Sequence, residues 1–285
     1  TVSEMLDKLF GKQVKKISAI AFLIAYITLA YVQLQTATSV MSSIFQIDWF
    51  TSVFIAAGLI TLYTYIGGMH ALAVTSIIHL VVMFVGLGIA TVIGLVNVGG
   101  FSNLQTILET KGAVGSVYNP FGVGFNEAFS LLLGGVLGGM AAQASIQPIF
   151  AARSPQIAKK AAILSSAYIA PFGIMSAILG LIAATGMYNI GTDNPKLAMT
   201  NLLVNADFIH PVLGGLALAG ILAAILSTVG PVNFAVVTIA TKDIYHGFIN
   251  PNADEQKIIK TAKKLVIVVS LITIPLAYYF NSGVL

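Results

Sequence analysis

The feature that most constrains this chain is a set of long stretches without any charged side chain. Asp, Glu, Lys and Arg are absent from residues 17–47, 49–108, 128–152, 161–192, 208–241 and 265–285. A membrane-spanning helix needs about 20 consecutive apolar residues, so the stretch 49–108 holds two such helices, with Gly67-Gly68 as a turn between them. The sequence therefore predicts seven spans, at 17–46, 49–66, 71–97, 127–150, 161–186, 209–241 and 263–285.

These spans are helices and not barrel strands, because barrel strands are short and alternate apolar with polar residues. We therefore expect an all-α integral membrane protein. Hydrophobic residues make up 57% of the chain and charged residues only 8%, against about 25% charged in a soluble domain. A soluble globular enzyme is excluded on that ground.

The chain also lacks the usual signatures of catalysis. It has no cysteine, which excludes a disulfide scaffold, a thiolate metal site and a cysteine nucleophile. It contains no HExxH, no GxSxG and no Asp pair within a span, and its two GxG matches follow no strand. We expect no enzyme activity, no organic cofactor and no nucleic-acid partner.

The distribution of basic residues predicts the orientation in the cell membrane. If residue 1 is cytoplasmic, the inside segments hold 12 of the 14 Lys and Arg residues, and only Lys111 and Lys196 lie outside. This excess fits the positive-inside rule. The sequence predicts irregular outside loops at 97–126 and 188–207, and an inside loop at 242–262 with a turn at Asn250-Pro251.

Polar residues within spans are candidate sites, because they are costly in lipid and usually face a partner, water or a substrate. Gln35 lies in the first span and either faces a solute or bonds a neighbouring helix. Gln143 and Gln147 are four residues apart and share a helix face, beside Pro148, which leaves the Ala144 carbonyl without its helical donor. A solute site and a simple kink are both compatible with this pattern.

The sharpest local pattern is Ala224-Ile-Leu-Ser227-Thr228-Val-Gly-Pro231. Ser227 and Thr228 follow Ala224 by three and four residues, so all three lie on one helix face. Two hydroxyl oxygens and the Ala224 carbonyl are oxygen ligands of the kind that hard cations such as Na⁺ prefer. The alternative is that the hydroxyls only bond back to preceding carbonyls.

Four segments of the chain resemble the sodium/solute symporter family, which includes proline, sugar, pantothenate and sialic acid carriers. TVSEMLDKLFG at 1–11 is similar to its cytoplasmic TxxE(F/Y)LxxRFG element, and YTYIGGMHA at 63–71 to its YTxxGGxxA turn. QPIFAAR at 147–153 resembles its QRxxAAK helix end. GILAAILST at 220–228, with DIY at 243–245, resembles its GLLAAxxST…DIY motif.

The resemblance implies part of a LeuT-like fold of five-plus-five inverted repeats, and sodium-coupled symport of a small organic solute, such as an amino acid or a carboxylate, by alternating access. Carried over by position, the Ala224 carbonyl and the Ser227 and Thr228 hydroxyls match the family's sodium site. Gln143 falls where the family has polar substrate-facing residues, and Gln147 is the Gln of the family's QR motif, so the resemblance offers both as candidate substrate residues. The expected partners are sodium, the solute and the lipid bilayer.

The departures from the family pattern leave alternatives open. Ser76 stands where the family often has Asp, and Val229-Gly230-Pro231 replaces a more polar continuation. These differences favour one coupling ion and leave a proton-carrying role for His79 open. A membrane sensor domain of a signalling protein is the other alternative. Residues 1–285 are expected to form one transmembrane transporter domain that is truncated at both ends.

Overall fold

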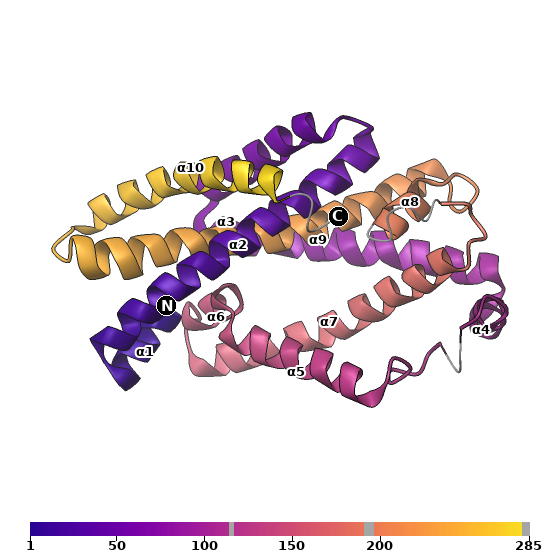
Figure 1. Cartoon of the computed structure of the whole chain (residues 1–285), viewed down its shortest axis with the longest axis horizontal. Helices are drawn as coiled ribbons and strands as arrows, with labels where there is room; N and C mark the ends of the chain where they lie inside the picture. Colours follow the sequence, from indigo (N-terminus) through magenta and orange to yellow (C-terminus); the bar gives the residue numbers. More distant parts are fainter. Residues whose placement is uncertain (114–116, 191–196, 281–285) are drawn as a thin grey trace. The chain divides into compact units, whose positions relative to one another are not determined.

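The computed structural model describes residues 1–113, 117–190 and 197–280, except for the side chain of Ala141. Nearly all of these residues are helical. In order they are α1 (Val2–Phe10), α2 (Lys12–Phe45), α3 (Trp49–Val98), α4 (Gly100–Thr110), α5 (Phe125–Ala141), α6 (Gln143–Phe150), α7 (Pro155–Ala184), α8 (Ala198–Val204), α9 (Pro211–Thr238), the π-helix η2 (Ile239–Ile249) and α10 (Glu255–Tyr279). Figure 1 follows them along the chain by colour. Each of the seven predicted spans falls on these helices, while residues 281–285 of the last span, and Lys196, lie outside the described residues.

The helix α3 is two spans joined at a break. At about 1.5 Å per residue, its 50 residues would extend far beyond the roughly 30 Å of a bilayer's hydrocarbon core. Gly68 interrupts the helix with φ 52° and ψ −170°, a conformation that residues with a Cβ rarely adopt. The turn predicted at Gly67-Gly68 is therefore confirmed.

The lengths and composition of the helices agree with a membrane protein. Four helices of the described chain are long and apolar enough to cross a membrane: α2, α3, α7, and α9 continued by η2. The segments Phe125–Met140 and Gln143–Phe150 make a fifth if they count as one span. The predicted span at 127–150 falls on these two segments, and the seventh predicted span falls on α10, outside this group.

The chain divides into two compact units. The first comprises Thr1–His79, Gln143–Ala151 and Ala224–Leu285. Within it, α2, η2 and α10 pack against one another, and α1 packs against α2 (Figure 1). The buried core of this unit draws on α2, α9, η2 and α10 and consists of Tyr26, Ala30, Val232, Ala235, Val236, Val237, Ile239, Val266 and Val269.

The second unit comprises Leu80–Ala142 and Ala152–Ala223. Within it, α7 packs against α4 and α8. The second half of α3 approaches α9 closely, since a Cβ placed on Gly86 would lie 2.6 Å from the carbonyl oxygen of Leu216. The absence of a side chain at this position therefore allows the two backbones to approach.

The predicted loops are more helical than the sequence suggested. The outside loop expected at 97–126 contains α4, and the loop expected at 188–207 contains α8. Both helices bury apolar side chains, for example Leu104 in α4 and Leu202 in α8, and this packing outweighs the glycine-rich sequence nearby. The expected inside loop at 242–262 is also wrong in extent, because helical structure continues to Ile249 and resumes at Glu255. Its predicted turn at Asn250-Pro251 is confirmed.

The glycines of α5 do not mark a close helix contact within their unit. Their spacing, with overlapping GxxxG pairs, predicts close helix packing. All four positions, Gly134, Gly135, Gly138 and Gly139, are exposed, and a Cβ placed on any of them meets no atom of the unit within 4 Å. That prediction is therefore not confirmed in the described residues.

Candidate functional site

The predicted cation ligands lie together on α9. The Ser227 Oγ donates a hydrogen bond to the Ala224 carbonyl at 2.7 Å, and the Thr228 Oγ1 donates to the same carbonyl at 3.2 Å. The back-bonding expected as one alternative is therefore present. It uses the hydroxyl protons, and the lone pairs of both hydroxyl oxygens remain able to accept a cation. The Ala224 carbonyl already accepts both hydroxyls and would have to release a hydrogen bond to bind a cation as well, so sodium binding at this motif stays a prediction.

The following turn of α9 brings the motif close to α3. A Cβ on Gly230 would lie 2.5 Å from the Tyr63 Cε1 and 2.7 Å from the Leu72 Cδ2, so a larger residue here would force these two side chains to move. Pro231 lies inside α9 and has no N–H to donate to the Ser227 carbonyl. This carbonyl is a fourth oxygen without its usual helical donor.

The chemistry of this donor set suits a hard monovalent cation. Its oxygens come from hydroxyl and carbonyl groups and carry no formal charge. Among the described residues, no group of three or more His, Cys, Asp or Glu side chains could hold a metal ion. The residues present thus fit sodium through neutral oxygen ligands.

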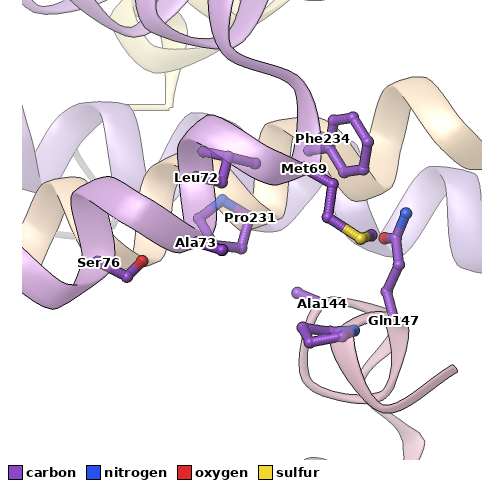
Figure 2. Close-up of a pocket in the computed structure, with 9 residues that line it drawn as sticks. Met69, Leu72, Ala73, Ser76, Ala144, Gln147, Pro231 and Phe234 are labelled. Atoms are coloured by element: carbon purple, nitrogen blue, oxygen red, sulfur yellow. The ribbon is translucent and has the colours of Figure 1, made fainter. Parts of the chain in front are cut away.

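A cavity of about 250 Å³ adjoins this part of α9 within the first unit. Its walls come from the start of the second half of α3, from α6 and from α9 (Figure 2). The lining residues are Met69, Leu72, Ala73, Ser76, Ala144, Gln147, Pro148, Pro231 and Phe234. The surface is mainly apolar, with the Gln147 amide and the Ser76 hydroxyl as its polar side chains.

Gln147 is the predicted substrate residue that lines this cavity. Its Nε2 donates a hydrogen bond to the Thr238 Oγ1 at 3.0 Å, which holds the amide against α9. Figure 2 shows Gln147 extending from α6 beside Met69. The amide is thus fixed at the cavity wall, where it can present an acceptor and a donor to a small molecule.

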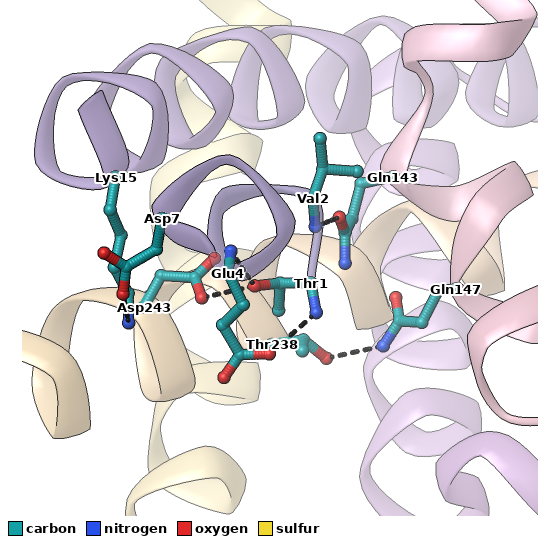
Figure 3. A network of polar contacts seen from close by, with 9 residues as sticks. All are labelled: Thr1, Val2, Glu4, Asp7, Lys15, Gln143, Gln147, Thr238 and Asp243. Carbon is teal, nitrogen blue, oxygen red and sulfur yellow. Dashed lines mark hydrogen bonds and ion pairs between the residues drawn. The ribbon is translucent and has the colours of Figure 1, made fainter. Parts of the chain in front are cut away.

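Gln143 instead joins α6 to the N-terminal helix. It is 1% exposed, and its Oε1 accepts a hydrogen bond from the Val2 N–H at 2.8 Å. Next to it, the Thr1 Oγ1 donates to the Asp243 Oδ1 at 2.6 Å and ties α1 to η2 (Figure 3). The structure therefore gives Gln143 a contact between elements, and its contact with a solute stays a prediction.

Gln35 also joins two helices. Its Nε2 donates to the Ala277 carbonyl of α10 at 2.9 Å, and its side chain is 2% exposed. The interhelical alternative is the one that the structure displays for this residue. Of the three predicted substrate glutamines, the structure brings only Gln147 to the cavity.

Sequence reasoning missed several residues of this cavity. Met69 and Phe234 are ordinary apolar residues in their spans. Thr238, the hydrogen-bond partner of Gln147, does not line this cavity and is one of many hydroxyls in the sequence. The cavity is lined by residues from 69–76, 144–148 and 231–234. A local sequence pattern cannot predict contacts between segments so far apart in the chain. Of the residues that were not predicted to line the cavity, Ser76 was noticed in the sequence, because it stands where the resembling family often has Asp.

Comparison with known proteins gives a consistent result along the whole chain. A family model described as "Sodium:solute symporter family" matches residues 1–285. The osmoregulated proline transporter OpuE of Bacillus subtilis is 23% identical over 289 residues, which cover 100% of this chain and 58% of that protein. A sodium/proline symporter of Escherichia coli is 26% identical, covering 92% and 52%, and one of Staphylococcus aureus is 25% identical, covering 85% and 48%. The chain thus spans about half the length of the curated relatives it matches.

A solved structure gives the same fold. It is described as the substrate-bound outward-open state of a Na⁺-coupled sialic acid symporter and matches with a TM-score of 0.83 at 17% identity. The match covers 99% of this chain and 61% of that one. The chain therefore has the all-α transporter architecture, part of a LeuT-like fold, that the sequence implied.

Proposed function

Because the chain belongs to the sodium:solute symporter family, we propose that it is part of a carrier that couples the entry of a small organic solute to sodium. The observation that carries this proposal is the oxygen cluster of Ala224, Ser227 and Thr228 on α9, beside a mainly apolar cavity. Sodium would bind at these oxygens. The solute would bind along the cavity, with Gln147 as one of its contacts.

The proposed solute is a small amino acid, with proline as the first candidate. Three relatives are named as proline transporters. The apolar ring of proline suits a cavity of about 250 Å³ whose walls include Met69, Leu72 and Phe234, while its charged carboxylate and ammonium groups need polar partners. The Gln147 amide would bond a polar group of the solute, since a buried polar group without a partner weakens binding.

Coupling would follow from shared preference for one conformation. Sodium and solute each stabilise the state to which they bind more tightly, and a carrier couples them when both favour the same state. Rocking of one helix bundle against another then exposes both ligands to the other side. We propose that α1 and the lysine-rich start of α10 face the cytoplasm, because of the excess of basic residues there.

Thermal unfolding of the purified chain in detergent tests sodium binding. The midpoint is compared in sodium chloride and in potassium chloride at equal ionic strength. Sodium at 100 times its dissociation constant should stabilise the protein by about 2.7 kcal/mol. Thr228→Ala should remove most of this sodium-specific rise, because it deletes one of the proposed ligands.

Thr36→Ala is the matched control. The Thr36 Oγ1 donates to the Val32 carbonyl at 3.1 Å on an exposed face, so the substitution deletes the same back-bond away from α9. An equal sodium shift in both variants and in the wild type would refute the α9 site. Sodium-driven proline uptake by the full-length gene product in proteoliposomes then tests the solute.

Proton coupling is the second candidate, and His79 supports it. Its Nδ1 is buried without a hydrogen-bond partner among the described residues, and its ring lies 6.4 Å from that of Tyr63. If protons drive transport, uptake should follow a pH gradient without sodium and should be lost in His79→Gln. Uptake that needs sodium and survives this substitution would exclude the proton role.

A further inference from the structure

A second, larger cavity of the first unit adjoins the break in α3. It has a volume of about 400 Å³ and is bounded by residues 64–68 of α3, by the end of α9 with the start of η2, and by 258–266 of α10. It shares Phe234 with the first cavity. Neither Gln147, the proposed solute contact, nor any of the candidate sodium ligands lines it, so the proposed transport does not account for it.

The charged groups of this cavity are all basic. Lys242 and Lys263 line it, and no acidic side chain is among its lining residues. The Lys263 Nζ lies 5.4 Å from the centre of the Tyr65 ring, which orients the ammonium group over an aromatic face. The cavity thus presents two exposed cationic side chains to whatever enters it.

A buried hydroxyl without a partner lies beside these lysines. Thr241 lines the cavity, is 2% exposed, and its Oγ1 has no hydrogen-bond partner among the described residues. A buried polar group without a partner carries a cost that a ligand can remove. One hydroxyl and two ammonium groups on the wall of one cavity make a donor set for phosphate oxygens.

The remaining wall is apolar and belongs to a membrane-spanning region. Val237, Ile258, Ile259 and Val266 line it together with Phe234. The lysines flank the ends of hydrophobic segments, and basic residues in such positions commonly meet lipid headgroups. A soluble anion would use the lysines and leave this apolar wall uncovered, whereas a phospholipid would use both.

We propose that this cavity binds one anionic phospholipid. Its phosphate lies between Lys242, Lys263 and the Thr241 hydroxyl, and the start of an acyl chain lies along the wall of Val237 and Ile259. Basic pockets between membrane helices bind anionic headgroups by this combination of charge and apolar contact. The occupied cavity would brace the break at Gly68 against η2 and α10.

Native mass spectrometry of the full chain in detergent measures this binding directly. The probes are dioleoyl phosphatidylglycerol, dioleoyl phosphatidylcholine and inorganic phosphate. We expect a one-to-one complex with phosphatidylglycerol. The double variant Lys242→Gln/Lys263→Gln should bind it about 25-fold more weakly, since each lysine near the headgroup contributes about fivefold.

The matched control is Lys260→Gln/Lys264→Gln, which removes the same charge from α10 at positions that do not line the cavity. It should keep the wild-type affinity within about twofold. An equal loss in both double variants would overturn the proposal, because attraction would then depend only on the overall charge. Equal binding of phosphatidylcholine, or binding of inorganic phosphate as tight as that of the lipid, would also overturn it.

Thr241→Val supplies a second, independent readout. If the Oγ1 bonds only the lipid, the variant should bind phosphatidylglycerol about tenfold more weakly. In lipid-free detergent it should unfold at a higher temperature than the wild type, because it no longer buries an unpaired hydroxyl. Unchanged affinity in this variant would exclude Thr241 from the site. None of these readouts requires transport or sodium, so they can fail independently of the proposed function.

Discussion

The close contact between α3 and α9 in the second unit allows a quantitative test with two neighbouring glycines. A Cβ on Gly86 would lie 2.6 Å from the Leu216 carbonyl oxygen and 3.0 Å from the Ala217 Cα, and both atoms belong to the backbone. A Cβ on Gly88 would meet only the Met175 Sδ, at 3.8 Å. Alanine should therefore destabilise the protein at position 86 and be tolerated at position 88.

Apart from this steric clash, the two substitutions should have the same effect on stability. Both replace glycine by alanine inside α3 and should gain about 0.5–1 kcal/mol of helix stability. Gly86→Ala also requires the backbones of α3 and α9 to separate by several tenths of an ångström, and overpacking of this kind costs about 1–3 kcal/mol. The helix term cancels in the comparison, so the two variants should differ by about 1–3 kcal/mol.

Thermal unfolding in detergent measures this difference. At about 2–4 °C per kcal/mol, the midpoint of Gly86→Ala should lie roughly 2–12 °C below that of Gly88→Ala, and Gly88→Ala should equal or exceed the wild type. Two midpoints that agree within 1 °C would refute the close backbone contact. A lower midpoint for Gly88→Ala alone would refute the assignment of the contact to Gly86.

Two further predictions concern the start of α3 and the anchoring of α1. The Thr51 hydroxyl and backbone N–H bond the exposed Asp48 carboxylate and lower its pKa below 3.8. This contribution to stability is present above that value and is lost as the pH falls through the folded pKa. The midpoint difference between wild type and Asp48→Ala should therefore shrink when melts at pH 6 and pH 3 are compared, and a constant difference would contradict the pKa shift. Gln143→Ala should leave the Val2 N–H unpaired, at a cost of about 1–3 kcal/mol, and should speed amide exchange in α1. Gln105→Ala in α4 is its control, and equal exchange in both variants would contradict the anchoring role.

The candidate cation site could be predicted from the sequence, because its three residues lie within one turn of a single helix. Residues three and four positions apart on one helix must share a face, and Ser227 and Thr228 accordingly meet at the Ala224 carbonyl. The glutamines could not be assigned in this way. Gln143 and Gln147 do share a face, but one contacts Val2 and the other Thr238, and these partners are far away in the sequence.

The sequence by itself located the charge-free stretches that form long helices and the break at Gly68, because the cost of placing a charge in lipid, or a side chain at a positive φ, depends on the residue alone. Only the tertiary structure decided that the glycine-rich segment before α5 contains α4, since Leu104 is buried by neighbours from elsewhere in the chain. It likewise decided which polar residues line a cavity. Gln147 lines the first cavity and Thr241 the second, because a cavity is formed by several helices together and its lining depends on how they pack.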